Sequence, residues 1–325
     1  MQKKKIYDLM LCLIIIGSLL TGCGGGEGDP APAPTPSPIP TNIWTPKADM
    51  STARAYLAAV ELNGKIYAIG GMNSSGVNMN TVEAYDPAKN TWATIANLPT
   101  ARGYLTAASV GGKIYAIGGN DVINTNLKTV EEYNPTTNSW ESKTAMTTAR
   151  YGMAAAIVNG IIYVIGGRNG AIPQKIVEAY DPVADSWETK ASMPTARAYL
   201  GAAAVNGKIY AIGGYSDSSR VAVVEEYDPV ADTWRTKTAM PTARDGLAAV
   251  AVNDKIYAIG GMNASFSHLA TVEEYNPVTN TWTTKTSMPT GRTGLTAAVA
   301  SGKIYAIGGY DSSDAYIAIM EQYTP

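Results

Sequence analysis

The chain is poor in the residues on which most metal and redox chemistry depends. Its 325 residues include one His and two Cys. One His excludes the sites that need two or more imidazoles, such as HExxH zinc sites and multi-histidine copper sites. Two Cys are too few for a disulfide framework. A net charge of −2 without a basic patch also argues against nucleic acid as a partner.

Apolar and small residues are abundant by comparison. Hydrophobic residues make up 46% of the chain, and 32 residues are Gly. A chain of this length and composition can bury a large core, so we expect a globular fold.

The first 22 residues have the features of a secretory signal. Lys3 to Lys5 form a basic segment, and the apolar run from Leu9 to Leu20 is too short to span a bilayer as a mature helix. Leu20-Thr21-Gly22-Cys23 resembles the bacterial lipobox, in which the Cys is lipidated and becomes the new N-terminus. We therefore expect residues 1–22 to be removed. A lipid on Cys23 should then anchor the protein in the cell envelope, in an extracytoplasmic location. The alternative is an ordinary signal peptide in which this Cys has no role.

A spacer follows over residues 23–41. Its first part is rich in Gly, and residues 30–40 carry Pro at nearly every second position. Gly-rich chain is flexible, whereas Pro-rich chain forms a stiff, extended spacer. We expect this segment to tether one folded domain, residues 42–325, to the membrane.

Residues 42–325 consist of one unit that is repeated six times. A Gly-Gly pair marks each copy, at residues 70–71, 118–119, 166–167, 213–214, 260–261 and 308–309. Every Trp of the chain keeps the same register: Trp44, Trp92, Trp140, Trp187, Trp234 and Trp282. Chance does not produce such a register, so the repeat decides the fold.

The fourth unit indicates that each repeat contains four strands, here called A to D. Residues 200–205 and 208–212 are the apolar strands A and B, joined by the turn Asn206-Gly207, which requires positive φ. Residues 223–227 and 233–236 are strands C and D, and a variable loop separates strands B and C. No segment shows sustained 3.6-residue periodicity, so helices should be nearly absent. Six such units predict an all-β fold, a six-bladed β-propeller.

The repeated sequence resembles the Kelch motif. It combines Ile-Tyr-Ala-Ile-Gly-Gly, Val-Glu-Glu-Tyr-Asn-Pro and a Trp at a constant distance, and it recurs from residue 44 to residue 323. The resemblance implies a Kelch β-propeller. In some Kelch proteins, arginines at the loop position before strand A contact an acidic peptide ligand.

The N-terminal strand of the domain should complete the last blade. Trp44 has the position of a strand D residue, whereas Tyr323 near the C-terminus has that of a strand C residue. We therefore predict that the segment around Trp44 pairs with the last strand, which removes the sheet edge that an open ring would expose.

Two Tyr per unit occupy equivalent positions, on strands B and C. Identical placement in every unit favours packing between blades over aromatic platforms for sugars or bases, and the same holds for the Trp. The strand B set is Tyr67, Tyr115, Tyr163, Tyr210, Tyr257 and Tyr305. The strand C set is Tyr85, Tyr133, Tyr180, Tyr227, Tyr275 and Tyr323.

One Arg before strand A and one Glu on strand C also recur. The starts of strands A and C lie at the same end of a blade, so both residues share one face. One hypothesis is a buried Arg–Glu pair that organises each blade. The other, which the resemblance implies, is a ring of arginines that binds acidic groups. The arginines are Arg54, Arg102, Arg150, Arg197, Arg244 and Arg292, and the glutamates are Glu83, Glu131, Glu178, Glu225, Glu273 and Glu321.

Ligand specificity should come from what differs between blades, because a sixfold ring cannot by itself recognise an asymmetric ligand. The B–C loops differ most, and loops on a rigid scaffold are where binding residues concentrate. The alternative is that they are only solvated, tolerant loops. The loops span residues 72–80, 120–128, 168–174, 215–221, 262–270 and 310–316. Their candidate ligand-binding residues are Asn73, Asp121, Arg168, Tyr215, Arg220, Phe266, His268, Tyr310 and Tyr316. Near the same face, strand A is preceded by Tyr56, Tyr104, Tyr151, Tyr199 and Asp245.

Several kinds of enzyme are excluded. Galactose-oxidase-like chemistry needs a Cys–Tyr cross-link and histidine copper ligands, which a mature chain with one His and no spare Cys lacks. The Walker A, GxSxG and CxxC motifs are absent. We expect no cofactor, and no metal either, since Asp217, Asp311 and Asp314 are not clustered as in a calcium loop.

The function predicted from the sequence is binding. We expect a monomeric, non-enzymatic module that binds protein or carbohydrate at the face formed by the B–C and D–A loops. The alternative is a sugar-processing enzyme resembling a sialic acid epimerase (mutarotase), with an acid–base pair drawn from Arg, Glu or His268.

Overall fold

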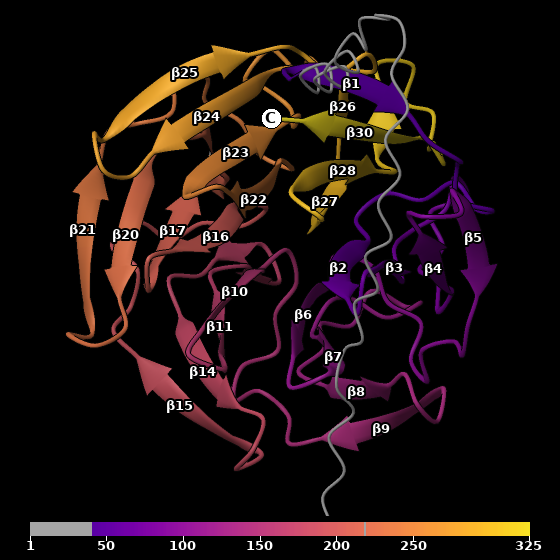
Figure 1. Ribbon diagram of the computed structural model, residues 1–325. Coiled ribbons are helices and arrows are strands. Elements are labelled where there is room, and N and C mark those ends of the chain that lie inside the picture. Colours follow the sequence, from indigo (N-terminus) through magenta and orange to yellow (C-terminus); the bar gives the residue numbers. More distant parts are fainter. Residues whose placement is uncertain (1–40, 218) are drawn as a thin grey trace, which may run out of the picture. The chain divides into compact units, whose positions relative to one another are not determined.

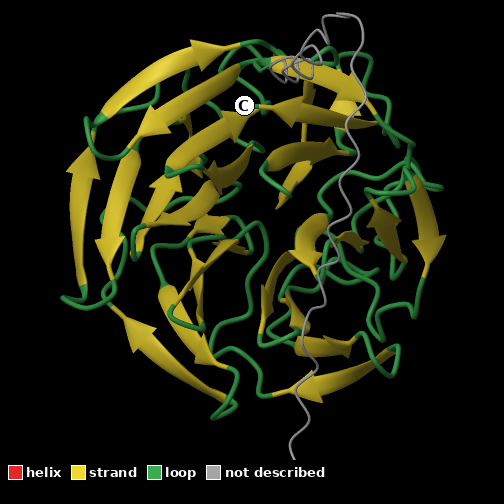
Figure 2. Ribbon diagram, viewed as in Figure 1, coloured by secondary structure: helices red, strands yellow, loops and turns green. Residues whose placement is uncertain are grey.

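The computed structural model describes residues 41–217 and 219–325. The expected signal sequence over residues 1–22, the expected lipid site at Cys23 and the spacer as far as residue 40 lie outside these residues. The described part of the chain folds as a β-propeller of six four-stranded antiparallel sheets, or blades, arranged around an axis (Figure 1). Figure 2 shows strands and loops, and no helix, in these residues. The predicted fold is therefore confirmed.

The blades contain strands A to D in the order of the predicted unit. Blade 1 consists of β2 (Ala58–Leu62), β3 (Lys65–Ile69), β4 (Val82–Asp86) and β5 (Thr91–Thr94), and blade 2 of β6 (Thr106–Val110), β7 (Lys113–Ile117), β8 (Val130–Asn134) and β9 (Ser139–Lys143). Blade 3 consists of β10 (Ala154–Val158), β11 (Ile161–Ile165), β14 (Val177–Asp181) and β15 (Ser186–Lys190), and blade 4 of β16 (Gly201–Val205), β17 (Lys208–Ile212), β20 (Val224–Asp228) and β21 (Thr233–Lys237). Blade 5 consists of β22 (Ala248–Val252), β23 (Lys255–Ile259), β24 (Val272–Asn276) and β25 (Thr281–Lys285). Blade 6 consists of β27 (Thr296–Ala300), β28 (Lys303–Ile307), β30 (Met320–Thr324) and the N-terminal β1 (Ile43–Pro46).

Short strand pairs also occur in loops where the sequence indicated irregular structure. They are β12 (Arg168–Asn169) with β13 (Ile172–Pro173), β18 (Tyr215–Ser216) with β19 (Ser219–Arg220), and β26 (Arg292–Thr293) with β29 (Tyr310–Asp311). These pairs are too short for a period-2 pattern to show in the sequence.

The ring closes through the N-terminal strand, as predicted. In Figure 1, β1 lies beside β30, and the two strands pair antiparallel with Trp44 opposite Tyr323. The Trp44 indole N–H donates to the carbonyl oxygen of Thr286 at 2.9 Å, which links blade 6 to blade 5. The five other Trp make the equivalent contact to the preceding blade, with N–O distances of 2.8–3.0 Å.

The two faces of the propeller differ in what they carry. Strand A is innermost and strand D outermost in each blade. Because neighbouring strands run antiparallel, the B–C loops and D–A connections lie at one end, and the A–B and C–D turns at the other. We call these ends the loop face and the turn face. Since β1 is a strand D, its first residue, Ile43, lies at the turn face.

Local sequence accounts for the hairpins. Asn206 and Gly207 have φ values of 50° and 72°, as a two-residue turn between right-twisted strands requires. Strand β17 is buried from Ile209 to Ile212 because both of its faces pack on neighbouring blades. Strand A of this blade begins one residue later than predicted, because its pairing with strand B starts at Gly201 opposite Ile212.

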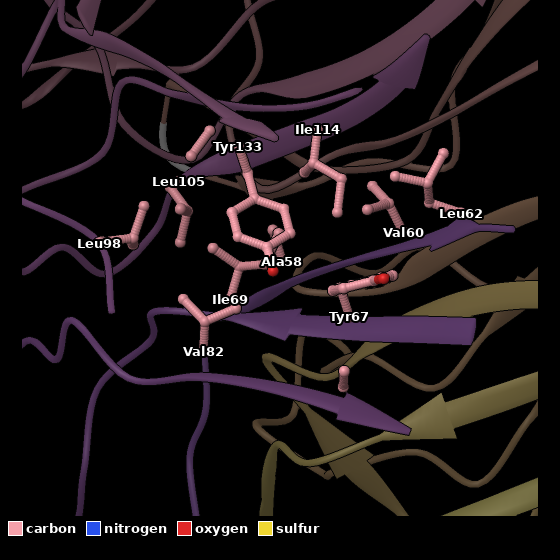
Figure 3. Close-up of a cluster of buried hydrophobic side chains, with 12 residues drawn as sticks. Ala58, Val60, Leu62, Tyr67, Ile69, Val82, Leu98, Leu105, Ile114 and Tyr133 are labelled. Atoms are coloured by element: carbon pink, nitrogen blue, oxygen red, sulfur yellow. The ribbon is translucent and has the colours of Figure 1, made fainter. Parts of the chain in front are cut away.

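The core is divided into six apolar layers, each between two neighbouring blades. Figure 3 shows the layer in which Val60 and Ile69 of blade 1 meet Ile114 and Tyr133 of blade 2. All twelve Tyr of strands B and C are at most 6% exposed, which confirms that they pack in the core. No blade can bury its faces alone, so stability depends on an unbroken circle.

A polar contact between the C–D turn of one blade and the D–A connection that precedes it also links neighbouring blades. In blade 1, Asn90 Oδ1 accepts hydrogen bonds from the Tyr85 hydroxyl at 2.7 Å and from the Ala48 amide at 2.9 Å. Blades 3 and 4 carry Asp185 and Asp232 at this position. The hydroxyl of the facing Tyr stabilises each carboxylate and lowers its pKa below the ordinary 3.8.

Replacing both acids, Asp185→Asn with Asp232→Asn, should reduce the sensitivity of the fold to acid. A carboxyl group with a folded-state pKa below its unfolded value adds stability above the unfolded value, and that stability is lost as the pH falls through the folded pKa. An Asn does not titrate, so the melting temperature of the double variant should fall less steeply than that of the wild type below about pH 4. The reverse change, Asn90→Asp with Asn138→Asp, should steepen the fall. Parallel melting curves for all three proteins would contradict this assignment.

Candidate ligand-binding face

The six arginines before strand A are buried in the propeller. All are 0% exposed, and each Nη2 lies 2.5–2.9 Å from a carboxylate oxygen of the Glu on strand C of the same blade. In blade 4, Arg197 Nη1 also donates to the carbonyl oxygens of Gly213 and Val223, at 2.8 and 2.9 Å. Burial lowers the pKa of Arg244 to about 10, so this guanidinium stays charged at neutral pH.

The pairing hypothesis is therefore correct in every blade. The hypothesis that Arg54, Arg102, Arg150, Arg197, Arg244 and Arg292 bind acidic groups of a ligand is contradicted, because no part of these side chains reaches the surface. The physical reason is that each guanidinium is surrounded by a carboxylate and by backbone carbonyls of strand B or its end and of the residue just before strand C, which together satisfy a buried charge.

A closed circle of backbone hydrogen bonds surrounds the mouth of the central channel. Each blade contributes the second residue after its buried Arg, and each amide donates to the carbonyl oxygen of the equivalent residue in the preceding blade, at 2.7–2.9 Å. The six residues are Tyr56, Tyr104, Gly152, Tyr199, Gly246 and Gly294. We call them the mouth ring.

All six mouth-ring residues have positive φ. The three Gly, at 61–65°, adopt this conformation without steric cost. Tyr56, Tyr104 and Tyr199, at 54–56°, do not, because a non-Gly residue in the left-handed region costs about 1–2 kcal/mol. In three blades the backbone is therefore strained at the residue that places an aromatic side chain at the channel mouth.

The glycines make room for these rings. A Cβ on Gly152 would lie 2.8 Å from the Tyr199 ring, and a Cβ on Gly294 would lie 2.9 Å from the Tyr56 ring. Tyr104 instead stacks on Tyr56, with ring centroids 4.1 Å apart. Each Tyr therefore leans over the preceding blade.

A pocket of about 190 Å³ opens beside this cluster, on the side of blades 5 and 6. Its walls include Tyr56, Tyr104, Tyr199, Asp245 and Met262. Burial raises the pKa of Asp245, and the nearby guanidinium of Arg220 opposes this effect. The pocket exists on this side because the mouth ring carries Gly in both blades.

A larger cleft of about 550 Å³ lies between the B–C loops of blades 5 and 6. It is lined by Met262, Phe266, Ser267, His268, Tyr310, Ser312 and Asp314. The rings of His268 and Tyr310 are T-shaped with centroids 4.9 Å apart, and Tyr310 stacks on Tyr316 with centroids 5.7 Å apart. The Tyr310 hydroxyl lies 2.9 Å from that of Tyr56, which connects the cleft to the mouth ring.

Arg220 holds neighbouring loops together. Its Nε donates to Asp245 Oδ1 at 2.8 Å, and its guanidinium lies 4.6 Å from the centroid of the Phe266 ring. Arg220 is therefore paired, although the sequence suggested a side chain free for ligand.

Arg168 contacts two aromatic rings near the opposite side of the mouth. Its guanidinium lies 6.0 Å from the Tyr199 ring and 5.7 Å from the Tyr215 ring, and Nη2 donates to the carbonyl oxygen of Ala171 at 2.5 Å. Among the described residues, no carboxylate lies close enough to Arg168 to form an ion pair. The structure therefore brings Arg168 and Tyr215 together at the loop face.

Two other sequence candidates are used by their own loops. Asn73 Oδ1 accepts the amides of Ser75 and Val77, and Asp121 Oδ1 accepts those of Ile123 and Thr125. These contacts hold the loops of blades 1 and 2 in shape, and a role of Asn73 and Asp121 in binding a ligand stays a prediction. Such a turn needs only an Asn or Asp at its start. Many exposed loops carry an Asn or Asp, so the sequence alone does not indicate this turn.

The residues that the sequence underrated are those of the mouth ring. Tyr56, Tyr104 and Tyr199 follow the recurring Arg at the position that is Gly in the other blades. This exchange of Gly for Tyr was the available signal, since Gly at a repeated position indicates positive φ.

Some kinds of site are not present in the described part of the chain. No group of three or more His, Cys, Asp or Glu there is placed to hold a metal ion. In the same residues no helix has the length and apolar character that crossing a membrane requires.

The comparisons with known proteins agree with the architecture. The model of the KLHDC2/KLHL20/DRC7 Kelch-repeats domain matches residues 40–192 and 185–309. No curated protein matches the chain. A solved structure described as that of YjhT is similar over 84% of this chain and 95% of its own, with 18% identity and a TM-score of 0.74. At this identity the likeness concerns the fold.

Proposed function

We propose that this chain, which belongs to the Kelch-repeat family, is a non-enzymatic binding module that takes a protein or carbohydrate ligand at its loop face. One observation carries the proposal: Tyr56, Tyr104 and Tyr199 occupy left-handed positions where the other three blades have Gly. Strained residues persist only where the surrounding structure holds them, and they concentrate at functional sites.

The loop face also suits binding because little of it would need to become ordered. The mouth ring is closed by six backbone hydrogen bonds, and the loops of blades 5 and 6 are held by Asx-type contacts and by the pair of Arg220 with Asp245. A preorganised site loses little conformational entropy when it binds.

The position of Ile43, at the start of β1, supports an outward orientation for this face. Ile43 lies at the turn face, so residues that precede it join the propeller at the end opposite the loop face. We propose that a lipid on Cys23 and the spacer over residues 23–41 hold a monomeric propeller at the outside of a membrane. The turn face would then lie toward the membrane and the loop face away from it.

The test removes the aromatic groups of the mouth ring and keeps its backbone. Tyr56→Gly, Tyr104→Gly and Tyr199→Gly together restore the residue that blades 3, 5 and 6 already carry, so the propeller should still fold. Immobilised protein of residues 42–325 is incubated with envelope extract of the source organism, and bound protein and carbohydrate are identified. We expect the triple variant to lose the captured ligand.

A matched control changes the turn face instead. Val183 is 98% exposed and Val230 is 88% exposed at C–D turns, so Val183→Ser with Val230→Ser should leave capture intact. Equal capture by the wild type, the triple variant and this control would show that the mouth ring does not bind the ligand.

One observation favours the alternative of a sugar-processing enzyme. Asp245 is a buried carboxyl group with a raised pKa that lines a pocket with three Tyr, and perturbed acids of this kind occur at catalytic sites. The same preparations can be incubated with N-acetylneuraminate while NMR follows its anomer ratio. A binding module leaves the rate of approach to equilibrium unchanged.

A further inference from the structure

The B–C loop of blade 5 holds an exposed aromatic residue in a strained backbone conformation. Four B–C loops share one conformation, in which a residue near the tip has φ of 58–72°. Blades 1, 2 and 6 place Gly76, Asn124 and Asp314 there, and these residue types tolerate left-handed backbone. Blade 5 places Phe266 there, which is the only Phe of the chain and is 70% exposed.

Neither folding nor solubility explains this residue. A bulky side chain at positive φ is strained, and an exposed ring gains little from the core. The ring contacts the Arg220 guanidinium, but Arg220 is already paired with Asp245. An exposed aromatic ring that is held in a strained backbone conformation beside a cleft indicates a ligand that covers the ring.

We propose that the cleft between the B–C loops of blades 5 and 6 binds a neutral saccharide, with Phe266 and Tyr310 against the apolar face of a sugar ring. This inference rests on the proposed binding function of the loop face. It names the chemical class of the ligand and places it on one side of that face.

The size of the cleft fits a small ligand. Its volume of about 550 Å³ lies within the roughly 300–1,000 Å³ of small-molecule sites. A protein partner would need a surface of about 800 Å² on each side. The cleft has two loops as its walls, so it suits a short saccharide better than the flat surface of a folded protein.

The chemistry of the lining matches the two sides of a sugar ring. Phe266 and Tyr310 offer aromatic faces to C–H groups, whereas Ser267, Ser312 and Asp314 offer hydroxyl and carboxylate groups to sugar hydroxyls. The His268 ring belongs to the same lining and lies beside Tyr310.

The charges at the cleft select a neutral sugar over an acidic one. No Lys or Arg lines the cleft, and Asp314 repels an anion. Arg220, whose guanidinium contacts the Phe266 ring of the lining, is paired with Asp245 at 2.8 Å. Arg168 contacts Tyr199 and Tyr215 and is not part of the lining.

The cleft continues toward the channel mouth. Met262 lines both the cleft and the smaller pocket beside the Tyr cluster, and the hydroxyls of Tyr310 and Tyr56 meet between them. A second sugar unit can therefore extend from the cleft to the mouth ring, so an oligosaccharide should bind more tightly than its monosaccharide.

The composition of the chain provides the reporters for the test. Since Phe266 and His268 are the only Phe and the only His, protein of residues 42–325 labelled at Phe and His gives one set of signals from each side chain. Cellotriose, maltotriose and triacetylchitotriose are titrated to millimolar concentration, with N-acetylneuraminate as the acidic comparison. We expect saturable shifts of both reporters with at least one neutral sugar, and no saturable shift with the acidic one.

Variants separate a bound sugar from a general effect on the loops. Phe266→Ala should weaken binding about tenfold as read from the His268 signals, because the stacking surface is gone. Val278→Ala, which truncates an 81% exposed side chain at a turn on the other face, should leave the affinity unchanged. An equal affinity for Phe266→Ala and wild type would overturn the assignment.

The outcomes also distinguish this inference from the proposed function. If no neutral sugar moves either reporter while envelope capture still depends on the mouth-ring Tyr, the saccharide cleft is wrong and the binding module stands. A saturable shift with N-acetylneuraminate alone overturns the neutral class. If capture is independent of the mouth ring but a neutral sugar shifts both reporters, the cleft stands and the proposed role of the mouth ring fails.

Discussion

Replacing Arg197 by Met should lower the free energy of unfolding by about 3–5 kcal/mol. The side chain is 0% exposed, and its Nη2 lies 2.7 Å from Glu225 Oε2. Its removal leaves a buried carboxylate without a cation, and it leaves the carbonyls of Gly213 and Val223 without their charged donor. An uncompensated buried charge costs more than the pair contributes, because desolvation is no longer offset.

Urea unfolding of residues 42–325 measures this effect, as a lower midpoint with an unchanged slope. The control is Arg235→Met, which removes an exposed guanidinium from strand D and should change the free energy by less than about 0.5 kcal/mol. The double variant with Glu225→Met should be less destabilised than the sum of the two single variants, because the stranded carboxylate is gone. A cost near that of the Arg235 control would mean that the pair does not organise the blade.

Removing residues 42–47 should lower the melting temperature by about 10 °C or more. These residues form the outer strand of blade 6, carry the Trp44 hydrogen bond to blade 5, and supply Asn42 to the Tyr323 hydroxyl at 2.8 Å. Their loss exposes the long edge of β30 and opens the contact between the first and last parts of the ring. An unprotected edge strand pairs with other chains, so the shortened protein should also self-associate.

Calorimetry and sedimentation at matched concentration compare a chain that begins at residue 48 with one that begins at residue 42. The second retains β1 and serves as the control. Trp44→Ala in the longer chain should have a smaller effect, because it keeps the backbone pairing of β1 with β30 and loses only the indole. A monomer with an unchanged melting temperature would show that β1 is dispensable for closure.

The arginine ring illustrates what the repeat pattern could not decide. The sequence places Arg197 and Glu225 on one face of a blade, and the structure confirms this placement. The sequence leaves open whether the guanidinium points toward the carboxylate or toward solvent, because both arrangements have the same spacing along the chain. The tertiary structure decides it: the guanidinium is 0% exposed and donates to Gly213, Val223 and Glu225, which lie 16 to 28 positions further along the chain.

The loop residues show the same difference between what the sequence predicts and what the tertiary structure decides. Asn73 and Phe266 belong to loops of one conformation, yet Asn73 is turned toward its own backbone and Phe266 faces a cleft. Loop position predicted exposure for both. The contacts of Arg220 with Asp245 and Phe266 join residues from three separate segments, and no local pattern encodes such a meeting.

The sequence by itself determined the repeat, the four strands of each unit, the closure by Trp44 and the composition of the core, because strand patterns and turn residues act over short distances along the chain. Only the tertiary structure decided which polar side chains stay accessible and which rings meet at the mouth. Closing the ring brings Tyr56 of blade 1 beside Tyr310 of blade 6, and that contact depends on the curvature of all six blades together.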